Sequence, residues 1–134
     1  MPPPRDVWYS YATIRVVPRP ERGEFVNVGV VLFARTARFL AARIAIDRTR
    51  LSAFAPDLDF AAVERHLAAF IAVCDGGPDG GLIAALPLSE RFHWLTAPRS
   101  TVIQLSPVHT GHGDDPQVAL DSLFAALVAP PSGP

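Results

Sequence analysis

The longest run of β-branched and aromatic residues in the chain is the segment 25–33, which only Asn27 and Gly29 interrupt. A run that is apolar on both faces is typical of an interior strand with cover on each side of the sheet, not of an edge strand. We therefore expect this segment to lie in the middle of a sheet. A buried Asn27 must find hydrogen-bond partners there, since leaving it unpaired costs about 1–3 kcal/mol.

A length of 134 residues, with 49% hydrophobic and 19% charged residues, predicts one globular domain with a substantial core. We place this domain at residues 8–128, between flexible tails at 1–7 and 129–134. The sequence has no apolar run of about 18 residues that would span a membrane, and no apolar segment of a secretory signal at its start. Because Cys74 is the single cysteine, no internal disulfide can form, and a cytoplasmic location is expected.

The twelve basic residues are all arginine, and the chain has no lysine. This excludes Schiff-base chemistry, a lysine general base and a phosphate-binding loop that depends on lysine. Arginine keeps its charge, so its work in this chain is limited to fixed positive charge and bidentate hydrogen bonding.

Charge is distributed unevenly along the chain. Residues 1–50 hold nine arginines and four acidic residues, a net charge of +5, whereas residues 51–134 hold three arginines and nine acidic residues, a net charge of −6. This pattern indicates either an anion-binding sheet or acidic helices that pack on a basic sheet and neutralise it. The overall net charge of −1 does not favour nucleic-acid binding.

The pattern of apolar residues and turn residues predicts an α+β fold. A three-stranded antiparallel meander is followed by one later strand, which gives a mainly antiparallel four-stranded sheet packed with two main helices. Asp57 or Asp59 would cap the first main helix, and Asp114 or Asp115 the last. The segment 108–113 is expected to be loop. The predicted strands are 9–17, 25–33, 39–46 and 101–105.

Polar residues at the start of the segment 25–33 form a first candidate site. Arg22 and Glu24 share a face of an extended chain and would form an ion pair. Asn27 and Gly29 would also share a face, so that the missing side chain at Gly29 leaves space beside a polar group. Arg22 and Asn27 therefore belong to the predicted binding set, together with the Arg99, Ser100 and Gln104 side chains described next. The plainer interpretation of Arg22 and Glu24 is a surface ion pair worth about 0–1 kcal/mol.

A second candidate site surrounds the predicted short strand 101–105. Arg99, Ser100 and Gln104 would bind an anionic group such as phosphate or carboxylate. His109 and Glu24 are candidates for moving a proton. The alternative is turn and cap chemistry by serine and threonine.

His109 and His112, followed by Asp114 and Asp115, do not have the spacing of a standard metal site. Because the aspartates also have a predicted helix-capping role, no metal site is predicted. No cofactor is predicted either.

The chain resembles the bacterial domain-of-unknown-function family three-zero-three-seven (DUF3037) over roughly residues 8 to 128. The resemblance is carried by YSYATIRVVPR at 9–19, RGEFVNVGVVLF at 22–33, APRSTVIQ at 97–104 and SPVHTG at 106–111. It implies no activity and no catalytic residues. It also implies a protein partner, because members of this family are often encoded beside a HipA-like kinase-fold protein. The positions that the resemblance marks are Arg15, Arg22, Glu24, Asn27, Gly29, Arg99, Ser100, Gln104, Pro107, His109 and Gly111.

Three functional hypotheses follow. The first is a small binding or adaptor module that docks a protein partner, possibly a HipA-like one. The second is a small enzyme, or the recognition subunit of one, that acts on an anionic group through Arg22, Arg99 and either Glu24 or His109. The third is nucleic-acid binding, which the sequence does not favour, since its candidates are Tyr9, Tyr11, Arg15 and Arg43 alone.

Overall fold

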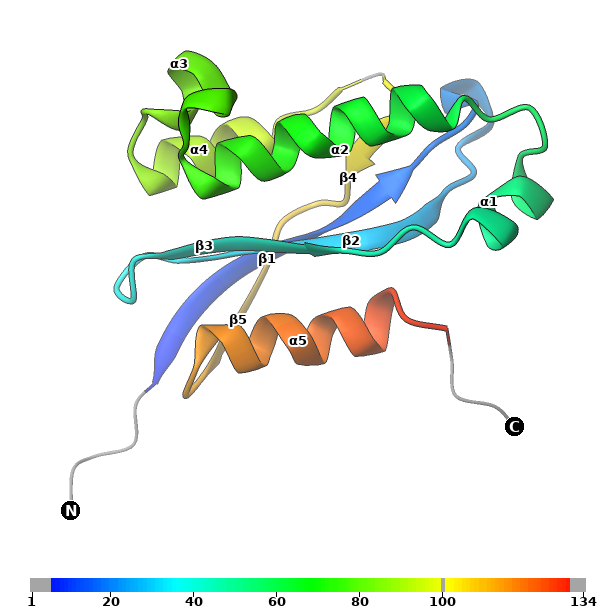
Figure 1. Ribbon diagram of the computed structural model, residues 1–134. Helices are drawn as coiled ribbons and strands as arrows, with labels where there is room; N and C mark the ends of the chain where they lie inside the picture. The colour runs from blue at the N-terminus through cyan, green and yellow to red at the C-terminus, as the bar shows by residue number, and fades with distance from the viewer. Residues whose placement is uncertain (1–5, 100, 131–134) are drawn as a thin grey trace.

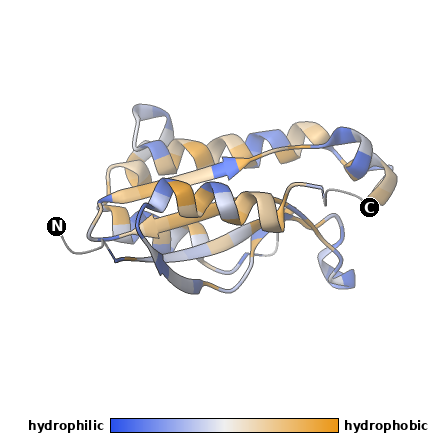
Figure 2. Ribbon diagram, turned by 90° about the horizontal axis from the view of Figure 1, so that it is seen from below, coloured by the Kyte–Doolittle hydropathy of each residue, from blue (hydrophilic) through white to orange (hydrophobic). Residues whose placement is uncertain are grey.

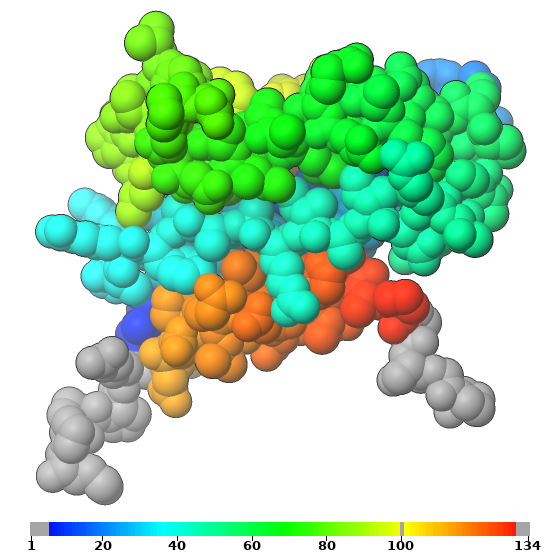
Figure 3. All heavy atoms as spheres, viewed as in Figure 1, coloured from blue at the N-terminus to red at the C-terminus, as the bar shows by residue number. Residues whose placement is uncertain are grey.

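The computed structural model describes residues 6–99 and 101–130. The molecule has three layers, in which a twisted sheet separates α2, α3 and α4 on one side from α5 on the other (Figure 1). The space-filling view in Figure 3 shows the same order, with the strand β3 at the sheet edge between the two helical layers. The helices are α1 (Arg48–Phe54), α2 (Phe60–Asp75), α3 (Gly81–Ala84), α4 (Leu88–Thr96) and α5 (Pro116–Leu127).

The sheet is antiparallel throughout and confirms the predicted α+β class. Its order is β3-β2-β1-β4, and β5 also pairs with β1. The predicted interior position of the segment 25–33 is confirmed, because β2 lies between β3 and β1. The strands are β1 (Val7–Val16), β2 (Val26–Ala34), β3 (Phe39–Ile44), β4 (Ile103–Leu105) and β5 (His109–Gly113).

The fifth strand corrects the prediction that residues 108–113 are loop. β4 and β5 pair one after the other with the same strand, β1, so together they form one interrupted edge strand. Leu105 lies opposite Ile14 and His109 opposite Tyr11, so three residues of the edge face two residues of β1. Pro107 sits in this interruption, where it has no N–H to donate to the ladder. The predicted fourth strand therefore exists, but it continues beyond the proline.

A second irregularity lies on the other side of β1. Gly29 pairs with Ile14 and Asn27 pairs with Arg15, which leaves Val28 as one extra residue in β2. Such a bulge reverses the alternation of side chains along the strand. Asn27 consequently faces α5, where its amide donates to the Leu127 carbonyl at 3.2 Å. Gly29 faces the opposite layer, so the prediction that these two residues share a face is wrong.

Two hydrophobic clusters hold the layers together. The larger, between the sheet and the α2–α4 layer, includes Ala12, Ile14 and Val16 of β1. The smaller, between the sheet and α5, includes Val30, Leu32 and Phe124, with Tyr9 and Tyr11 packed against its side. Figure 2 views the molecule from the side of α5, with the hydrophobic residues in orange. Even-numbered residues of β1 thus face the α2–α4 layer, which we call the upper layer. Tyr9, Tyr11, Thr13 and Arg15 face the α5 side.

Three helices begin at aspartates, as their sequences favour. The side chains of Asp47, Asp59 and Asp115 accept hydrogen bonds from backbone N–H groups in the first turns of α1, α2 and α5. Of the predicted alternatives, Asp59 and Asp115 are therefore the caps. Gly76 ends α2 with a φ of 74°, as the glycine pair after the helix predicts.

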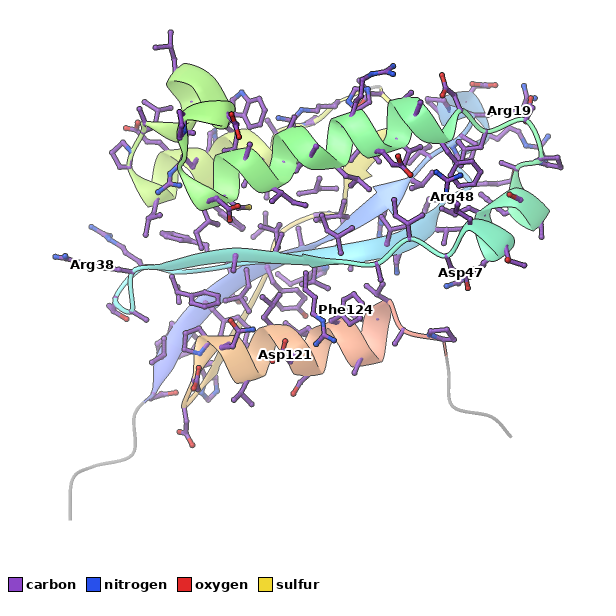
Figure 4. The ribbon with its side chains drawn as sticks, viewed as in Figure 1. Arg19, Arg38, Asp47, Arg48, Asp121 and Phe124 are labelled. Atoms are coloured by element: carbon purple, nitrogen blue, oxygen red, sulfur yellow. The ribbon has the colours of Figure 1, made fainter. Side chains whose placement is uncertain are left out.

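The predicted flexible tails lie largely outside the described residues. The described part begins at Asp6, and β1 already starts at Val7, one residue before the predicted domain boundary. At the β2–β3 turn, Arg38 has a φ of 51° and points away from the molecule (Figure 4). No helix within residues 6–99 or 101–130 is long and apolar enough to cross a membrane.

Candidate functional site

Three polar residues lie in one row across the sheet, on the face that α5 shares. Arg15 of β1 pairs with Asn27 of β2 on one side and with Gln104 of β4 on the other. Paired residues of antiparallel strands point to the same face, with Cβ atoms roughly 5 Å apart. The structure therefore brings together two residues of the predicted binding set, Asn27 and Gln104, with Arg15 between them.

The two strand irregularities decide which residues share this face. The extra residue between β4 and β5 places His109 on the same face as Gln104, although residues five apart in an unbroken strand would point to opposite faces. The bulge at Val28 places Asn27 there as well. Both irregularities border the same part of β1, residues 12–15. Bulges are over-represented beside functional sites, where they redirect side chains.

Arg15 is half-buried but lacks the partners that buried arginines usually have. Its Nε atom is buried without a hydrogen-bond partner. Within residues 6–99 and 101–130, no carboxylate lies within ion-pair distance of its guanidinium. The guanidinium carbon lies 3.9 Å from the centre of the Phe25 ring, a cation–π contact that orients the side chain. Burial lowers the pKa of Arg15, because the charged form loses hydration.

The row continues along β1 as a strip of aromatic and polar side chains. Thr13 is 7% exposed, and its hydroxyl oxygen has no hydrogen-bond partner. Tyr11 lies beside His109, with ring centres 5.4 Å apart. Tyr9 lies across Gly111, where an added Cβ would come within 2.7 Å of the ring. We call these seven residues the open strip: Tyr9, Tyr11, Thr13, Arg15, Gln104, His109 and Gly111.

The helix α5 covers this face only in part. It contacts mainly β2 and β3, and Figure 2 shows strands extending beyond the helix. In Figure 4, Phe124 rises from α5 toward the sheet, on the same helix as Asp121. Between α5 and the β1–β5 pair lies a groove of about 610 Å³, whose lining includes Tyr9, Val118 and Leu123. The open strip forms the sheet side of this face.

Asn27 also lines a second, smaller pocket at the C-terminal end of α5. This pocket has a volume of about 160 Å³ and is bounded by Leu51, Phe124 and Val128. Because the Asn27 Nδ2 group donates to Leu127, its Oδ1 atom points elsewhere, and it is buried without a partner. The cost expected for an unpaired buried asparagine is therefore only partly avoided.

Arg22 and Glu24 form the ion pair that the sequence predicts, but outside the open strip. The Arg22 Nε donates to Glu24 Oε1, and both side chains are at least half exposed. The hydrogen bond to Arg22, together with its positive charge, lowers the pKa of Glu24. The pair lines a hollow of about 260 Å³ beside Arg19 and Phe54.

Arg99 lies in the upper layer, where its side chain donates hydrogen bonds to carbonyl groups in the last turn of α4. Its guanidinium donates to the carbonyls of Leu95 and Trp94 at 2.7 and 2.6 Å, and it stacks over the Phe70 and Trp94 rings. Because α2 and α4 cover the face of the sheet opposite α5, Arg99 does not join Gln104. Ser100, also predicted to bind an anion, lies outside the described residues.

The two candidate proton-transfer residues, Glu24 and His109, are far apart. His109 lies opposite Tyr11, whereas Val26, two residues after Glu24, lies opposite Val16. The five residue steps along β1 from Tyr11 to Val16 span about 16 Å. An acid–base pair needs contact at about 3 Å or one bridging water. The structure therefore does not assemble the catalytic pair of the enzymatic hypothesis.

The two histidines of β5, His109 and His112, lie on opposite faces of the sheet. His109 stacks beside Tyr11, while His112 lies beside Trp8 on the opposite face, with ring centres 4.8 Å apart. The His112 Nδ1 atom is 2.7 Å from an Asp6 carboxylate oxygen. No group of three or more metal-ligating side chains occurs within the part of the chain that the structure describes.

Part of the charge asymmetry is resolved by pairing between the two halves of the chain. Arg19, Arg43 and Arg48 pair with the second-half acids Asp57, Asp121 and Glu64. Of these arginines, Arg43 lies in the sheet, so the interpretation that acidic helices neutralise a basic sheet is supported at that position. Arg43, a candidate for nucleic-acid contact, is engaged with Asp121 and with the Phe124 ring.

The sequence interpretation left Arg15 out of the predicted binding set. A signal was present, because Arg15 is a charged residue between Ile14 and Val16 in an otherwise apolar strand end. Its neighbours could not be predicted, because they depend on two irregularities that change which side chains meet.

Comparison with known proteins identifies one family. The model of DUF3037, described as a protein of unknown function, matches residues 11–128, nearly the whole chain. No curated protein and no solved structure matches the chain at a significant level. The matched residues include the row Asn27, Arg15 and Gln104 across the sheet, and also His109 of the open strip. The chain belongs to the DUF3037 family of proteins of unknown function.

Proposed function

We propose that the protein is a small binding or adaptor module that docks a partner protein through the open strip and the adjoining groove of α5. The observation that carries this proposal is the half-covered face of the sheet, where the Arg15 Nε atom and the Thr13 hydroxyl are buried without hydrogen-bond partners among the described residues. Buried polar atoms in folded proteins are nearly always paired, so unpaired ones at an open face favour a bound partner.

The occupant that best fits this face is an extended segment of the partner. The strip from Tyr9 to Arg15 covers six residue steps of β1, about 20 Å, which matches six residues of extended chain. Tyrosine side chains supply rigid contact area at low entropic cost. The exposed Val118, with 60% of its surface accessible, adds an apolar contact on the α5 wall of the groove.

A HipA-like protein in the cytoplasm is the partner that the family resemblance suggests. The test is co-expression of the two proteins, followed by size-exclusion chromatography with light scattering. Two variants form a matched pair, because Val118→Arg lies in the groove and Leu82→Arg lies at an exposed position on α3, on the other side of the sheet. We expect Val118→Arg to weaken the complex at least about tenfold and Leu82→Arg to leave it unchanged.

Three outcomes would contradict this proposal. The protein elutes alone at micromolar concentration in the presence of the HipA-like protein, or both variants bind equally well. In the third, the chain forms a homodimer that Val118→Arg disrupts, in which case a second copy and not a partner occupies the groove.

The enzymatic alternative receives less support. It needed Arg22 and Arg99 to hold an anion beside Glu24 or His109. Arg22 pairs with Glu24, but Arg99 lies in another layer of the molecule and His109 in a third place on β5. Recognition of an anionic group remains favoured by Arg15, at a different position from the one predicted.

A further inference from the structure

Three arginines within residues 6–99 and 101–130 are half-buried, namely Arg15, Arg91 and Arg99, and they differ in whether they have partners. Arg19, Arg22, Arg43 and Arg48 pair with carboxylates. Arg91 and Arg99 donate to backbone carbonyls of the upper layer. Arg15 is half-buried, is held by Phe25 and has neither kind of partner among the described residues. A buried charge without a partner is destabilising, so its retention requires a compensating role.

We infer that Arg15 is the anchor of a carboxylate-binding site, and that the segment docking on the open strip carries a carboxylate to it. This inference rests on the proposed docking role of the strip and adds the chemistry of the group that is recognised. The guanidinium fork matches a carboxylate through two parallel hydrogen bonds. The Phe25 ring, 3.9 Å away, fixes the plane of that fork before the ligand arrives.

The neighbours of Arg15 supply further polar groups. The Gln104 amide donates one hydrogen bond to the Thr101 carbonyl at 3.0 Å, which leaves its second N–H for a ligand. Asn27 faces Arg15 from the other side, and its Oδ1 atom accepts no hydrogen bond. That oxygen is buried, so it does not contact the ligand. An extended peptide can pack along the whole open strip, whereas a free inorganic anion reaches only Arg15 and Gln104.

Charge favours a carboxylate over a phosphate. A phosphate carries more charge and is usually held by several cations. On this face, Arg43 is already neutralised by Asp121, and Asp114 and Asp115 line the far end of the groove. One guanidinium suits a single negative charge, and these aspartates oppose a polyanion.

The first experiment titrates the full chain with short peptides and follows backbone amide signals by NMR. The probes are an N-acetylated, C-amidated pentapeptide of alanine with a central glutamate, and the same peptide with glutamine in its place. At constant ionic strength, we expect saturable shifts at Arg15, Asn27 and Gln104, with the glutamate peptide binding about tenfold more tightly. Pentaalanine with a free C-terminus tests whether a chain-end carboxylate serves as well as a side chain.

Two variants that each remove one positive charge form the matched controls. Arg15→Gln should abolish the preference for glutamate over glutamine. Arg22→Gln, in the hollow beside Arg19, should leave the preference unchanged. Equal binding of the two peptides, shifts centred on Arg19 and Arg22, or tighter binding of inorganic phosphate would each overturn the inference.

The same variants in the complex separate this inference from the proposed function. If the complex forms, is weakened by Val118→Arg and is unaffected by Arg15→Gln, the docking role stands and the carboxylate site is wrong. If the glutamate peptide binds through Arg15 but no partner protein binds, the carboxylate site stands and the docking role falls.

Discussion

Arg99 in the α2–α4 layer and Arg15 at the open strip are both half-buried arginines, but they differ in the hydrogen bonds that their guanidinium groups make. Both guanidinium groups stack on aromatic rings. Arg99 donates to two carbonyls at the end of α4, so its hydrogen bonds close a helix terminus. Arg15 has a buried Nε without a partner. The first arrangement contributes to folding, whereas the second leaves binding capacity unused within the chain.

The two layers around these arginines differ in the same way. Above the sheet, α2 and α4 close over the larger hydrophobic cluster. Below it, α5 alone covers β2 and β3, and the β1–β5 pair remains open beside it. The comparison teaches that a polar cluster in the sequence is not itself a site, since its partners decide whether it serves structure or recognition. The following predictions test this division.

The largest expected effect concerns Cys74, which is buried in the upper layer. Burial raises the pKa of its thiol from an ordinary value of 9.0 to about 12. At pH 8 the thiolate fraction would then be roughly 1,000-fold lower than in the unfolded chain, because each pKa unit changes it tenfold. Alkylation by iodoacetamide should be slower by at least that factor in the native protein than in urea. Comparable rates would show that the upper layer opens readily.

Replacement of Arg99 tests whether the hydrogen bonds that this arginine makes within the chain stabilise the fold. Arg99→Ala removes the donors of the Leu95 and Trp94 carbonyls and the stacking on Phe70. We expect the free energy of unfolding to fall by about 2–4 kcal/mol, measured by urea denaturation. Arg35→Ala, an exposed position in the β2–β3 turn, is the control and should change little. A loss equal to that of the control would remove Arg99 from the stabilising contacts.

Much of the fold could be predicted from local sequence patterns. The apolar run ending at Phe33 placed an interior strand correctly, and Asp59 and Asp115 marked helix starts through a short-range capping interaction. These features depend on neighbours within a few residues, so the sequence contains their causes directly.

The site could be predicted only in part, because it depends on register. One extra residue at Val28 separates Asn27 from Gly29, and one extra residue around Pro107 brings His109 to the face of Gln104. A change of one residue reverses the face of every side chain beyond it. The sequence thus identified Asn27, Gln104 and His109 as polar candidates, but it grouped them with Arg22 and Arg99. It named Arg15 only as a position marked by the resemblance and as a nucleic-acid candidate, not as a binding residue beside them.

Gly111 provides a test of the packing within the open strip. An alanine Cβ at Gly111 would lie 2.7 Å from the Tyr9 ring, whereas nothing lies within 4 Å of the corresponding position at Gly113. We expect Gly111→Ala to displace Tyr9 and to cost about 1–2 kcal/mol, with Gly113→Ala as a nearly neutral control. Urea denaturation measures the cost, and NMR shifts of the Tyr9 ring report the displacement. Equal effects of the two variants would contradict the close packing of Tyr9 on Gly111.

The smallest expected effect on stability is at Arg15, and this gives the sharpest contrast with Arg99. Arg15→Gln removes the cation–π contact with Phe25, worth about 0.5–1 kcal/mol, and also removes a desolvated charge whose Nε is unpaired. The two terms oppose each other, so the free energy of unfolding should change by less than about 0.5 kcal/mol in urea denaturation. A loss of about 2 kcal/mol or more, as at Arg99, would mean that Arg15 has a structural partner after all. Near-neutral stability combined with loss of glutamate-peptide binding would instead separate the two arginines by role, since Arg15 would then contribute to recognition without contributing to the stability of the fold.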